Sequence, residues 1–420
     1  MYRTILAALD GSAHSGHGGD IAVELAAHSG AEIVACHVYS SALHSQRFVD
    51  MEPGLPAKYQ HGPDLDRLRG LHDSLIAEGF QALSQGYMDD LIRRAGLAGA
   101  KVRPLAVSGQ NYVSILQAAE RVGADLIVLG AQGLGANGDT LLGSTAARVM
   151  RHAACDVLLA RGTLTRELDR KTELRPIIAG IDGSDEALAA ARRAAQWAAA
   201  MHLPLELAAA YDPDFHNEVF RVMAGALTPQ RQEQVGLAKQ EDLHEDLIND
   251  GLARLYRDFL DAAGAEVRNE KAPQLSLLRG KAYAALVRRA QDAAAGLLVV
   301  ARHGHHRQAM SLLGSNAEAS AQRCGCNVLI VASTKKESQD TAIRTASAAE
   351  VGASPAAAPP AVQWDAGALR RLERIPSFAR PMAQRAIEQA ARDGGLGGVT
   401  EAVFEQVARR FGMGGGAGDA

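Results

Sequence analysis

A glycine-rich segment in the N-terminal half has the composition of a phosphate-binding loop. After the apolar run Leu126–Leu129 the chain reads Gly130-Ala-Gln-Gly133, then nine residues, then Gly143-Ser144. Glycine tolerates unusual backbone angles and lets the main chain approach a bound anion closely. This spacing predicts a loop that holds phosphate through main-chain N–H groups.

A predicted helix begins where this loop ends. Gly143, Ser144 and Thr145 lead into a helix expected over residues 145–152. The free N–H groups and the dipole at a helix N-terminus favour phosphate. The hydroxyl groups of Ser144 and Thr145 add further donors. We therefore expect the phosphates of a ligand at this helix end.

Two strand ends supply candidates for the rest of such a ligand. Asp10 follows the apolar run Ile5–Leu9, and Val38 ends the run Ile33–Val38. In open parallel sheets, ligands bind beyond the carboxyl ends of the strands. Asp10 can accept hydrogen bonds from ribose hydroxyls or an adenine amine, and Val38 offers apolar and main-chain contacts to a base. Asp10 also fits the N-cap of the next helix, and both roles can coexist.

The chain contains a duplicated pattern. Asp10 and its flanking Ile5–Ser12 segment return as Asp182 within Ile177–Ser184, 172 residues later. Leu142-Gly143-Ser144 returns as Leu313-Gly314-Ser315, 171 residues later. Ser108-Gly109 likewise returns as Arg279-Gly280, 171 residues later. Three landmarks in order at nearly one spacing indicate two copies of one domain. We call them the first copy and the second copy.

Each copy alternates short apolar runs with longer amphipathic stretches. The apolar runs are typical of buried parallel strands, and the stretches between them have helical spacing. Strand–helix alternation predicts an α/β fold, here two tandem Rossmann-like domains with parallel sheets. The expected boundaries are 1–163 and 173–335, followed by an Ala/Pro/Ser-rich flexible linker over 336–362 and a small all-α domain over 363–412.

The second copy departs from the loop pattern. Asp182 and Ala210 match Asp10 and Val38, but Ala301 replaces the first glycine. Arg302 and Arg307 make this loop basic, whereas the first-copy loop has no Lys or Arg between Gly130 and Gly143. The first copy thus has the better backbone for phosphate and the second the better charge. We favour the first copy and expect a degenerate site in the second, made of Asp182, Ala210, Gly304, Gly314 and Ser315.

The pattern G-x2-G-x9-G-[S/T], with Asp-Gly-Ser at the end of the first strand, resembles the ATP-binding subgroup of the universal stress protein (UspA-like) family. The resemblance covers about residues 1–335 as two copies. It implies a five-stranded parallel sheet in each copy, pairing of the copies through their last strands, and ATP or another adenine nucleotide as ligand, with or without Mg²⁺. A further homodimer stays open. The site residues that it implies in the first copy are Asp10, Gly11, Ser12, Val38, Gly130, Gly133, Gly143, Ser144 and Thr145.

The C-terminal segment resembles a second family. The stretch from Trp364 through Leu369, Leu372 and Ile375 to Phe378 is similar to the small helical domain at the end of one component of light-independent protochlorophyllide reductase. The iron–sulfur cysteines of that enzyme are absent, so no reductase chemistry is implied. Helices are expected over Trp364–Arg374, Pro376–Arg392 and Thr400–Phe411.

Composition excludes several classes. A formal net charge of -4 lacks the basic excess of a nucleic-acid-binding protein, and no apolar run reaches the ~20 residues of a membrane span. We expect a cytoplasmic protein in which Cys36, Cys155, Cys324 and Cys326 are reduced thiols, with no metal site. No residue is placed as a catalytic base, so at most slow ATP hydrolysis is expected, and we do not interpret the chain as an enzyme.

These features favour a stress-response or regulatory protein in which nucleotide occupancy changes a conformation that an unknown protein partner reads. Two alternatives remain. In the first, the copies form a scaffold or adaptor that binds no nucleotide. In the second, the chain is a helper protein in tetrapyrrole or photosynthetic metabolism and acts through its C-terminal helices.

Overall fold

The computed structural model describes most of the duplicated region. It covers residues 1–332 apart from 57–58, 60–62, 136–140, 169–170, 237–245, 269–271 and 306–311. Towards the C-terminus it describes residues 363–365, 367–369, 384, 387, 398–401 and 404. The expected linker and most of the expected C-terminal helices lie outside these residues. The chain divides into two compact units, residues 1–337 and 338–420.

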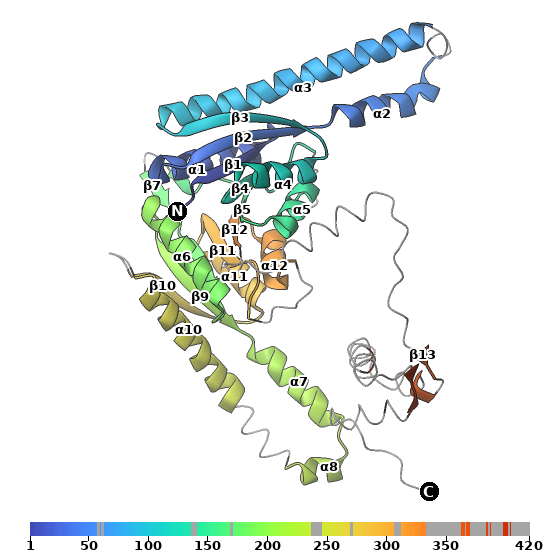
Figure 1. Ribbon diagram of the computed structural model, residues 1–420. Coiled ribbons are helices and arrows are strands. Elements are labelled where there is room, and N and C mark those ends of the chain that lie inside the picture. Colours follow the sequence, from blue (N-terminus) through green and yellow to red (C-terminus); the bar gives the residue numbers. More distant parts are fainter. Residues whose placement is uncertain are drawn as a thin grey trace. The chain divides into compact units, whose positions relative to one another are not determined.

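The larger unit is built on one ten-stranded sheet, with the strand order β10-β9-β8-β11-β12-β5-β4-β1-β2-β3. Figure 1 shows the two halves of this sheet meeting at β5 and β12. The first copy contributes β1 (Thr4–Leu9), β2 (Glu32–Tyr39), β3 (Lys101–Ser108), β4 (Leu126–Gly130) and β5 (Asp156–Ala160). The second contributes β8 (Ile177–Ile181), β9 (Leu205–Tyr211), β10 (Gln274–Arg279), β11 (Leu297–Ala301) and β12 (Asn327–Val331).

The two copies join through their last strands. All pairs within each copy are parallel, but β5 and β12 are antiparallel, with Leu158 opposite Leu329. This is the pairing that the family resemblance implied, made here within one chain. A short antiparallel hairpin of β6 (Thr165–Leu168) and β7 (Lys171–Leu174) connects the copies along the sequence.

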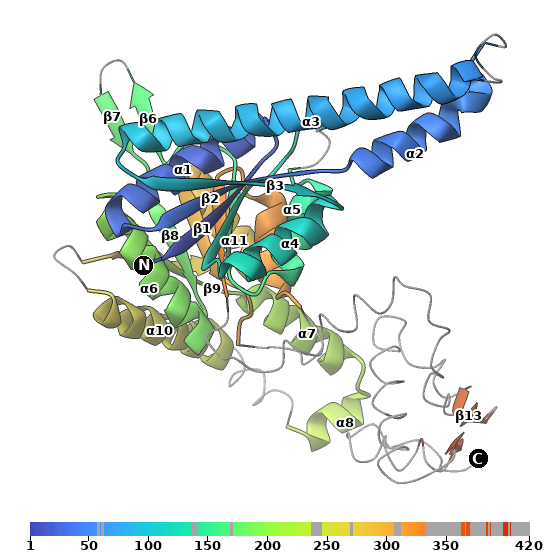
Figure 2. The same ribbon diagram turned by 45° about the horizontal axis from the view of Figure 1, so that its top comes forward.

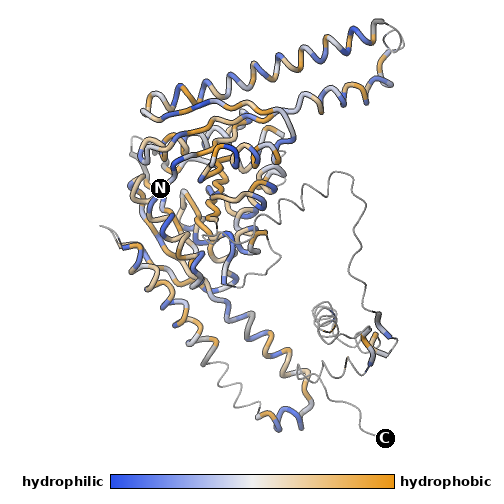
Figure 3. Tube along the Cα trace, viewed as in Figure 1, coloured by the Kyte–Doolittle hydropathy of each residue, from blue (hydrophilic) through white to orange (hydrophobic). Residues whose placement is uncertain are grey.

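Helices cover both faces of the sheet (Figure 2). One face packs against α1 (Ala13–Ser29), α3 (Pro63–Leu97), α6 (Asp185–Ala200) and α10 (Leu252–Glu266). The other packs against α4 (Asn111–Val122), α5 (Ser144–His152), α11 (Ala282–Asp292) and α12 (Ser315–Arg323). The central strands are strongly hydrophobic (Figure 3), as expected for strands that are buried on both faces. Leu158, Leu159, Val328 and Leu329 are fully buried where the copies meet.

The remaining helices project from the edges of the sheet. In the first copy, α2 (Ser41–Met51) lies beside the N-terminal part of α3, and the short 3-10 helix η1 (Glu52–Gly54) follows α2 (Figure 1). Only the C-terminal part of α3 enters the core, through Met88, Leu91 and Ala95. In the second copy the chain forms α7 (Pro213–Gly225), α8 (Pro229–Gln234) and the π-helix η3 (Asp246–Gly251).

The described part of the smaller unit contains a two-stranded parallel sheet of β13 (Gln363–Trp364) and β14 (Gly398–Val399). The expectation that a helix begins at Trp364 is therefore wrong, because this residue pairs with Val399 in a strand. The helical turn starts after Asp365, whose Oδ1 accepts a hydrogen bond from Ala368 N at 2.7 Å. In the described residues, no helix is long and apolar enough to cross a membrane.

Candidate functional site

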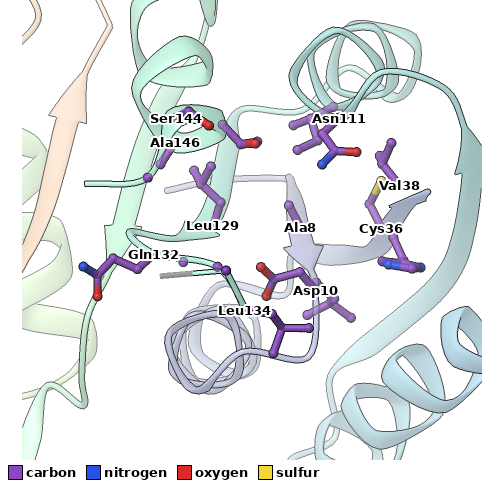
Figure 4. Close-up of a pocket in the computed structure, with 18 of the residues that line it drawn as sticks. Ala8, Asp10, Cys36, Val38, Asn111, Leu129, Gln132, Leu134, Ser144 and Ala146 are labelled. Atoms are coloured by element: carbon purple, nitrogen blue, oxygen red, sulfur yellow. The ribbon is translucent and has the colours of Figure 1, made fainter. Parts of the chain in front are cut away.

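A cavity of about 590 Å³ opens at the carboxyl ends of the first-copy strands. Its volume lies within the range of about 300–1,000 Å³ typical of small-molecule sites. In Figure 4, Asp10, Val38, Asn111 and Ser144 surround the cavity from four different elements. Seven of the nine residues expected in the first copy line it: Asp10, Val38, Gly130, Gly133, Gly143, Ser144 and Thr145.

Gly11 and Ser12 do not line the cavity and have structural roles. Gly11 has φ +78°, and a Cβ there would lie 2.5 Å from the ring of Tyr87. Ser12 caps α1, because its Oγ accepts a hydrogen bond from Ser15 N at 3.1 Å. The Ser12 hydroxyl also donates to Gln132 O at 3.3 Å, which ties the start of α1 to the glycine-rich loop.

Asp10 has one oxygen engaged by the protein and one available. Its Oδ1 accepts a hydrogen bond from Ser12 N at 3.0 Å. Its Oδ2 receives no hydrogen bond from the residues that the structure describes. A carboxylate oxygen in a cavity wall without a donor is suited to accept a hydrogen bond from a ligand hydroxyl or amine.

Gly130 and Gly133 are needed for close approach and not for unusual backbone angles. None of Gly130, Gly133 and Gly143 has positive φ, so of the two properties that glycine offers, these positions do not use unusual backbone angles. A Cβ on Gly130 would lie 2.8 Å from Ser15 N, and one on Gly133 would lie 2.6 Å from Asp10 Oδ2. The glycines thus let the loop pass directly over the start of α1 and over the Asp10 carboxylate.

The N-terminus of α5 forms the polar end of the cavity. Gly143 is the N-cap residue, and its N–H donates to Ala131 O at 2.7 Å, which fixes the loop against the helix start. The first-turn residues Ser144, Thr145 and Ala146 all face the cavity. First-turn N–H groups have no partner within the helix, so they are oriented to bind an anion. The described lining contains no Lys or Arg. The hydrogen-bond donors for an anion at this end are therefore the first-turn N–H groups and the hydroxyls of Ser144 and Thr145.

At the opposite end of the cavity, the main chain of Val38 borders the space. Tyr39 O accepts a hydrogen bond from Gly109 N at 2.8 Å, so the Tyr39 peptide groups face β3. Successive residues of a parallel strand face opposite neighbours, so the N–H and C=O of Val38 face the side of β1. Since β1 last pairs with β2 at Leu9 and His37, the Val38 main chain meets the cavity instead of a strand.

Helix α3 supplies a wall that the sequence pattern did not reveal. Phe80, Leu83 and Tyr87 line the cavity from this helix. The many charged residues of α3 are typical of a solvated helix, and this pattern does not mark these three positions. Their signal in the sequence is helical spacing of large side chains within an otherwise polar stretch.

The second copy has the same loop path but a carboxylate that is already satisfied. Asp182 Oδ1 accepts hydrogen bonds from Ser184 N at 3.0 Å and Ser184 Oγ at 2.5 Å, and its Oδ2 accepts one from His305 N at 2.9 Å. Gly314 N donates to Arg302 O at 2.8 Å, as Gly143 N does to Ala131 O. Both carboxylate oxygens of Asp182 therefore already accept hydrogen bonds from the protein.

Arg302, one of the two arginines that make the second-copy loop basic, does not offer its charge to an anionic ligand. This side chain is 5% exposed and donates from Nη1 to Met150 O at 2.8 Å, in the last turn of first-copy α5. The Arg302 guanidinium is therefore buried between the copies. Arg307 and His306 lie outside the described residues.

The cysteines and histidines do not form a metal centre in the described part of the chain, where no group of three or more His, Cys, Asp or Glu residues could hold a metal. All four cysteines are free thiols, and Cys36, Cys324 and Cys326 are buried. His303 is buried as well.

Comparisons with known proteins match both parts of the chain. The family model described as "Universal stress protein family" matches residues 1–161 and again 173–332. The model described as "Proto-chlorophyllide reductase 57 kD subunit" matches residues 364–407. Similar curated proteins include a universal stress protein of Thermus aquaticus, 30% identical over 161 residues that cover 38% of this chain and 100% of the relative. Universal stress protein YxiE of Bacillus subtilis is 27% identical over 161 residues, with the same coverage of each chain.

Solved structures that are similar to this chain include a protein of unknown function from Pseudomonas aeruginosa PAO1. It is 14% identical, with a TM-score of 0.49, over 79% of this chain and 92% of that one. A universal stress protein in complex with cAMP is 26% identical, with a TM-score of 0.26, over 38% of this chain and 96% of that one.

Proposed function

Because this chain belongs to the universal stress protein family, we propose that its first copy binds an adenine nucleotide, with the phosphates at the N-terminus of α5 and the nucleoside beside Asp10 and Val38. Proteins of this family are stress-response proteins and generally not enzymes. The observation that carries the proposal is the first-copy cavity itself. Its wall contains both the Asp10 Oδ2 oxygen, which accepts no hydrogen bond from the described residues, and the N-terminus of α5. The glycine spacing of its loop, which resembles that of the ATP-binding subgroup, supports an adenine nucleotide as the ligand class.

The difference between the copies supports one nucleotide site per chain. Asp10 has an oxygen free for a ligand, whereas the Asp182 carboxylate is bound by Ser184 and His305 N. The second copy then acts as the partner on which the first is built, since its last strand completes the sheet beside β5. Nucleotide binding would change the conformation of the protein, and a protein partner would recognise that change.

Calorimetric titration of the full chain with ATP tests the proposal. Gly143→Asp places a carboxylate at the N-terminus of α5, where it repels phosphate, and we expect at least a tenfold loss of ATP affinity. Gly314→Asp is the matched control, because it makes the same change at the equivalent position of the second copy. Equal ATP affinity in wild type and Gly143→Asp would refute the site. Absence of ATP binding by the wild type would favour a scaffold instead.

The C-terminal match favours a second role for residues 364–407. A helper function in tetrapyrrole metabolism would make the chain bind pigment through this segment. Co-expression with a tetrapyrrole pathway should then give the purified protein pigment absorbance that is lost on deletion of residues 363–420. Absorbance that survives the deletion, or never appears, would contradict this role.

A further inference from the structure

We propose that His37 makes the first-copy cavity selective for purines with a 6-amino group, and that Asn111 is a second, less discriminating contact to the base. This inference rests on the proposed nucleotide function and names the feature of the nucleotide that the cavity recognises. Both residues line the cavity. His37 lies on β2 next to Val38, and Asn111 is the first residue of α4.

Hydrogen bonding fixes which nitrogen of His37 carries the proton. Ser84 Oγ lies 2.6 Å from Phe80 O and 2.7 Å from His37 Nδ1. A carbonyl oxygen only accepts, so the single Ser84 proton points to Phe80 O. Ser84 Oγ can then only accept from the histidine. His37 Nδ1 is therefore protonated, and in the neutral ring Nε2 presents a lone pair.

The surroundings keep the ring neutral and in place. His37 is 8% exposed and Ser84 is 1% exposed. Burial lowers the pKa of His37, and the nearby Asp10 carboxylate partly opposes this effect. Tyr87 contacts the ring edge-on, with centroids 5.2 Å apart, and Tyr39 stacks at 6.2 Å. Nε2, on the side of the ring away from Ser84, receives no hydrogen bond from the described residues. It is an oriented acceptor without a donor.

An oriented acceptor discriminates between the common purines. The 6-amino group of adenine donates a hydrogen bond, whereas the 6-oxo group of guanine would set its own lone pairs against Nε2. The Asn111 side chain makes no hydrogen bond with the described residues, so its carboxamide is free to rotate and can offer either a donor or an acceptor. Histidine with a fixed tautomer thus sets the preference, and asparagine adds affinity for either base.

The second copy gives an internal comparison. The positions equivalent to His37 and Asn111 are Ala209, opposite Ile181 in the sheet, and Ala282, the first residue of α11. The second copy, in which the protein's own groups bind the Asp182 carboxylate, thus has alanine at both positions. Polar groups occur at these two places only in the copy with an available carboxylate, which is the distribution expected of ligand contacts.

Titration of the full-length protein with ATP, GTP and purine riboside triphosphate, which lacks the 6-substituent, tests the inference. We expect wild type to prefer ATP to both others by about tenfold or more, the size of one net hydrogen bond. In His37→Ala, ATP and purine riboside triphosphate should bind within about twofold of each other. Ser84→Ala should also reduce the preference for ATP, because the proton of the His37 ring is then no longer held on Nδ1. Asn111→Ala should weaken ATP and GTP alike.

His44→Ala is the control, because His44 packs on Phe80 at 5.0 Å but does not line the cavity, and it should leave the ratio unchanged. Wild-type protein that binds ATP and purine riboside triphosphate equally would overturn the selectivity and leave nucleotide binding intact. Failure of wild type to bind ATP would overturn both proposals. If His37→Ala does not fold, the three ligands on wild type and Ser84→Ala still decide the question.

Discussion

The guanidinium of Arg302, at the end of second-copy β11, donates a hydrogen bond to Met150 O, 2.8 Å away in the last turn of first-copy α5. Arg161, at the end of first-copy β5, donates in the opposite direction to Ala321 O, 2.6 Å away in second-copy α12. Each copy thus places an arginine at the C-terminus of the helix that follows the other copy's loop, α5 or α12. The helix dipole also favours a cation at this end. The loop helices are coupled across the interface through their ends.

Arg302→Ala should lower the free energy of unfolding by about 2–3 kcal/mol, because it leaves buried carbonyls without their charged donor. Arg302→Lys should recover only part of this loss, since a lysine ammonium lacks the planar fork of donors. Chemical denaturation with urea measures both. Arg254→Ala, which removes an exposed donor to Asp250 O, should change the midpoint little. A midpoint for Arg302→Ala equal to that of Arg254→Ala would show that the cap does not contribute.

Gly133→Ala should abolish ATP binding while Gly135→Ala leaves it within about twofold of wild type. A Cβ at Gly133 would lie 2.6 Å from Asp10 Oδ2 and force the carboxylate or the loop to move, whereas a Cβ at Gly135 meets nothing within 4 Å. The two changes are chemically identical and two residues apart in one loop. Titration with ATP compares them, with thermal unfolding as the check on folding. Similar ATP affinities in the two variants would show that the position of the Asp10 carboxylate does not affect nucleotide binding.

The sequence predicted the buried part of the fold better than its edges. Strands such as Ile5–Leu9 and Val328–Val331 are continuous apolar runs because helices cover both of their faces. The edge strands β3 and β10 escaped the same criterion, since residues such as Lys101, Arg103 and Gln274 face solvent. Edge strands are half-exposed and polar, so they lack the run that reveals a central strand.

The candidate site divides in the same way. The loop glycines and Asp10 are close in sequence to strand ends, so their meeting follows from the topology of a parallel sheet. The direction of Arg302 does not, because it depends on which carbonyl of the other copy lies opposite. Likewise, nothing in residues 80–87 indicates that Tyr87 packs over Gly11. Contacts of this kind depend on how elements that are distant in sequence pack together.

The thiols should differ in reactivity in an order that exposure alone would not give. Hydrogen bonding from Cys326 lowers the pKa of Cys324 to about 7, whereas burial raises the pKa of Cys155 to about 12 and that of Cys36 to about 12. Only the thiolate reacts with iodoacetamide. Cys324 should therefore be alkylated before Cys155, although Cys155 is the more exposed. Peptide mass spectrometry after timed quenching gives the order, and earlier labelling of Cys155 would contradict it.

Acidification should destabilise the protein through three histidines whose pKa is lowered in the folded state. Burial lowers the pKa of His14, His37 and His152 below the ordinary 6.5. The unfolded chain then binds protons that the folded chain does not. The stability that these histidines contribute is fully present above pH 6.5 and is lost as the pH falls through the folded-state values. Urea unfolding between pH 5 and pH 7.5, without nucleotide, should show this decline, and His37→Gln should make it shallower. An unchanged slope in His37→Gln would mean that His37 takes up a proton over the same pH range in the folded and unfolded chains, and that its burial does not favour the neutral ring.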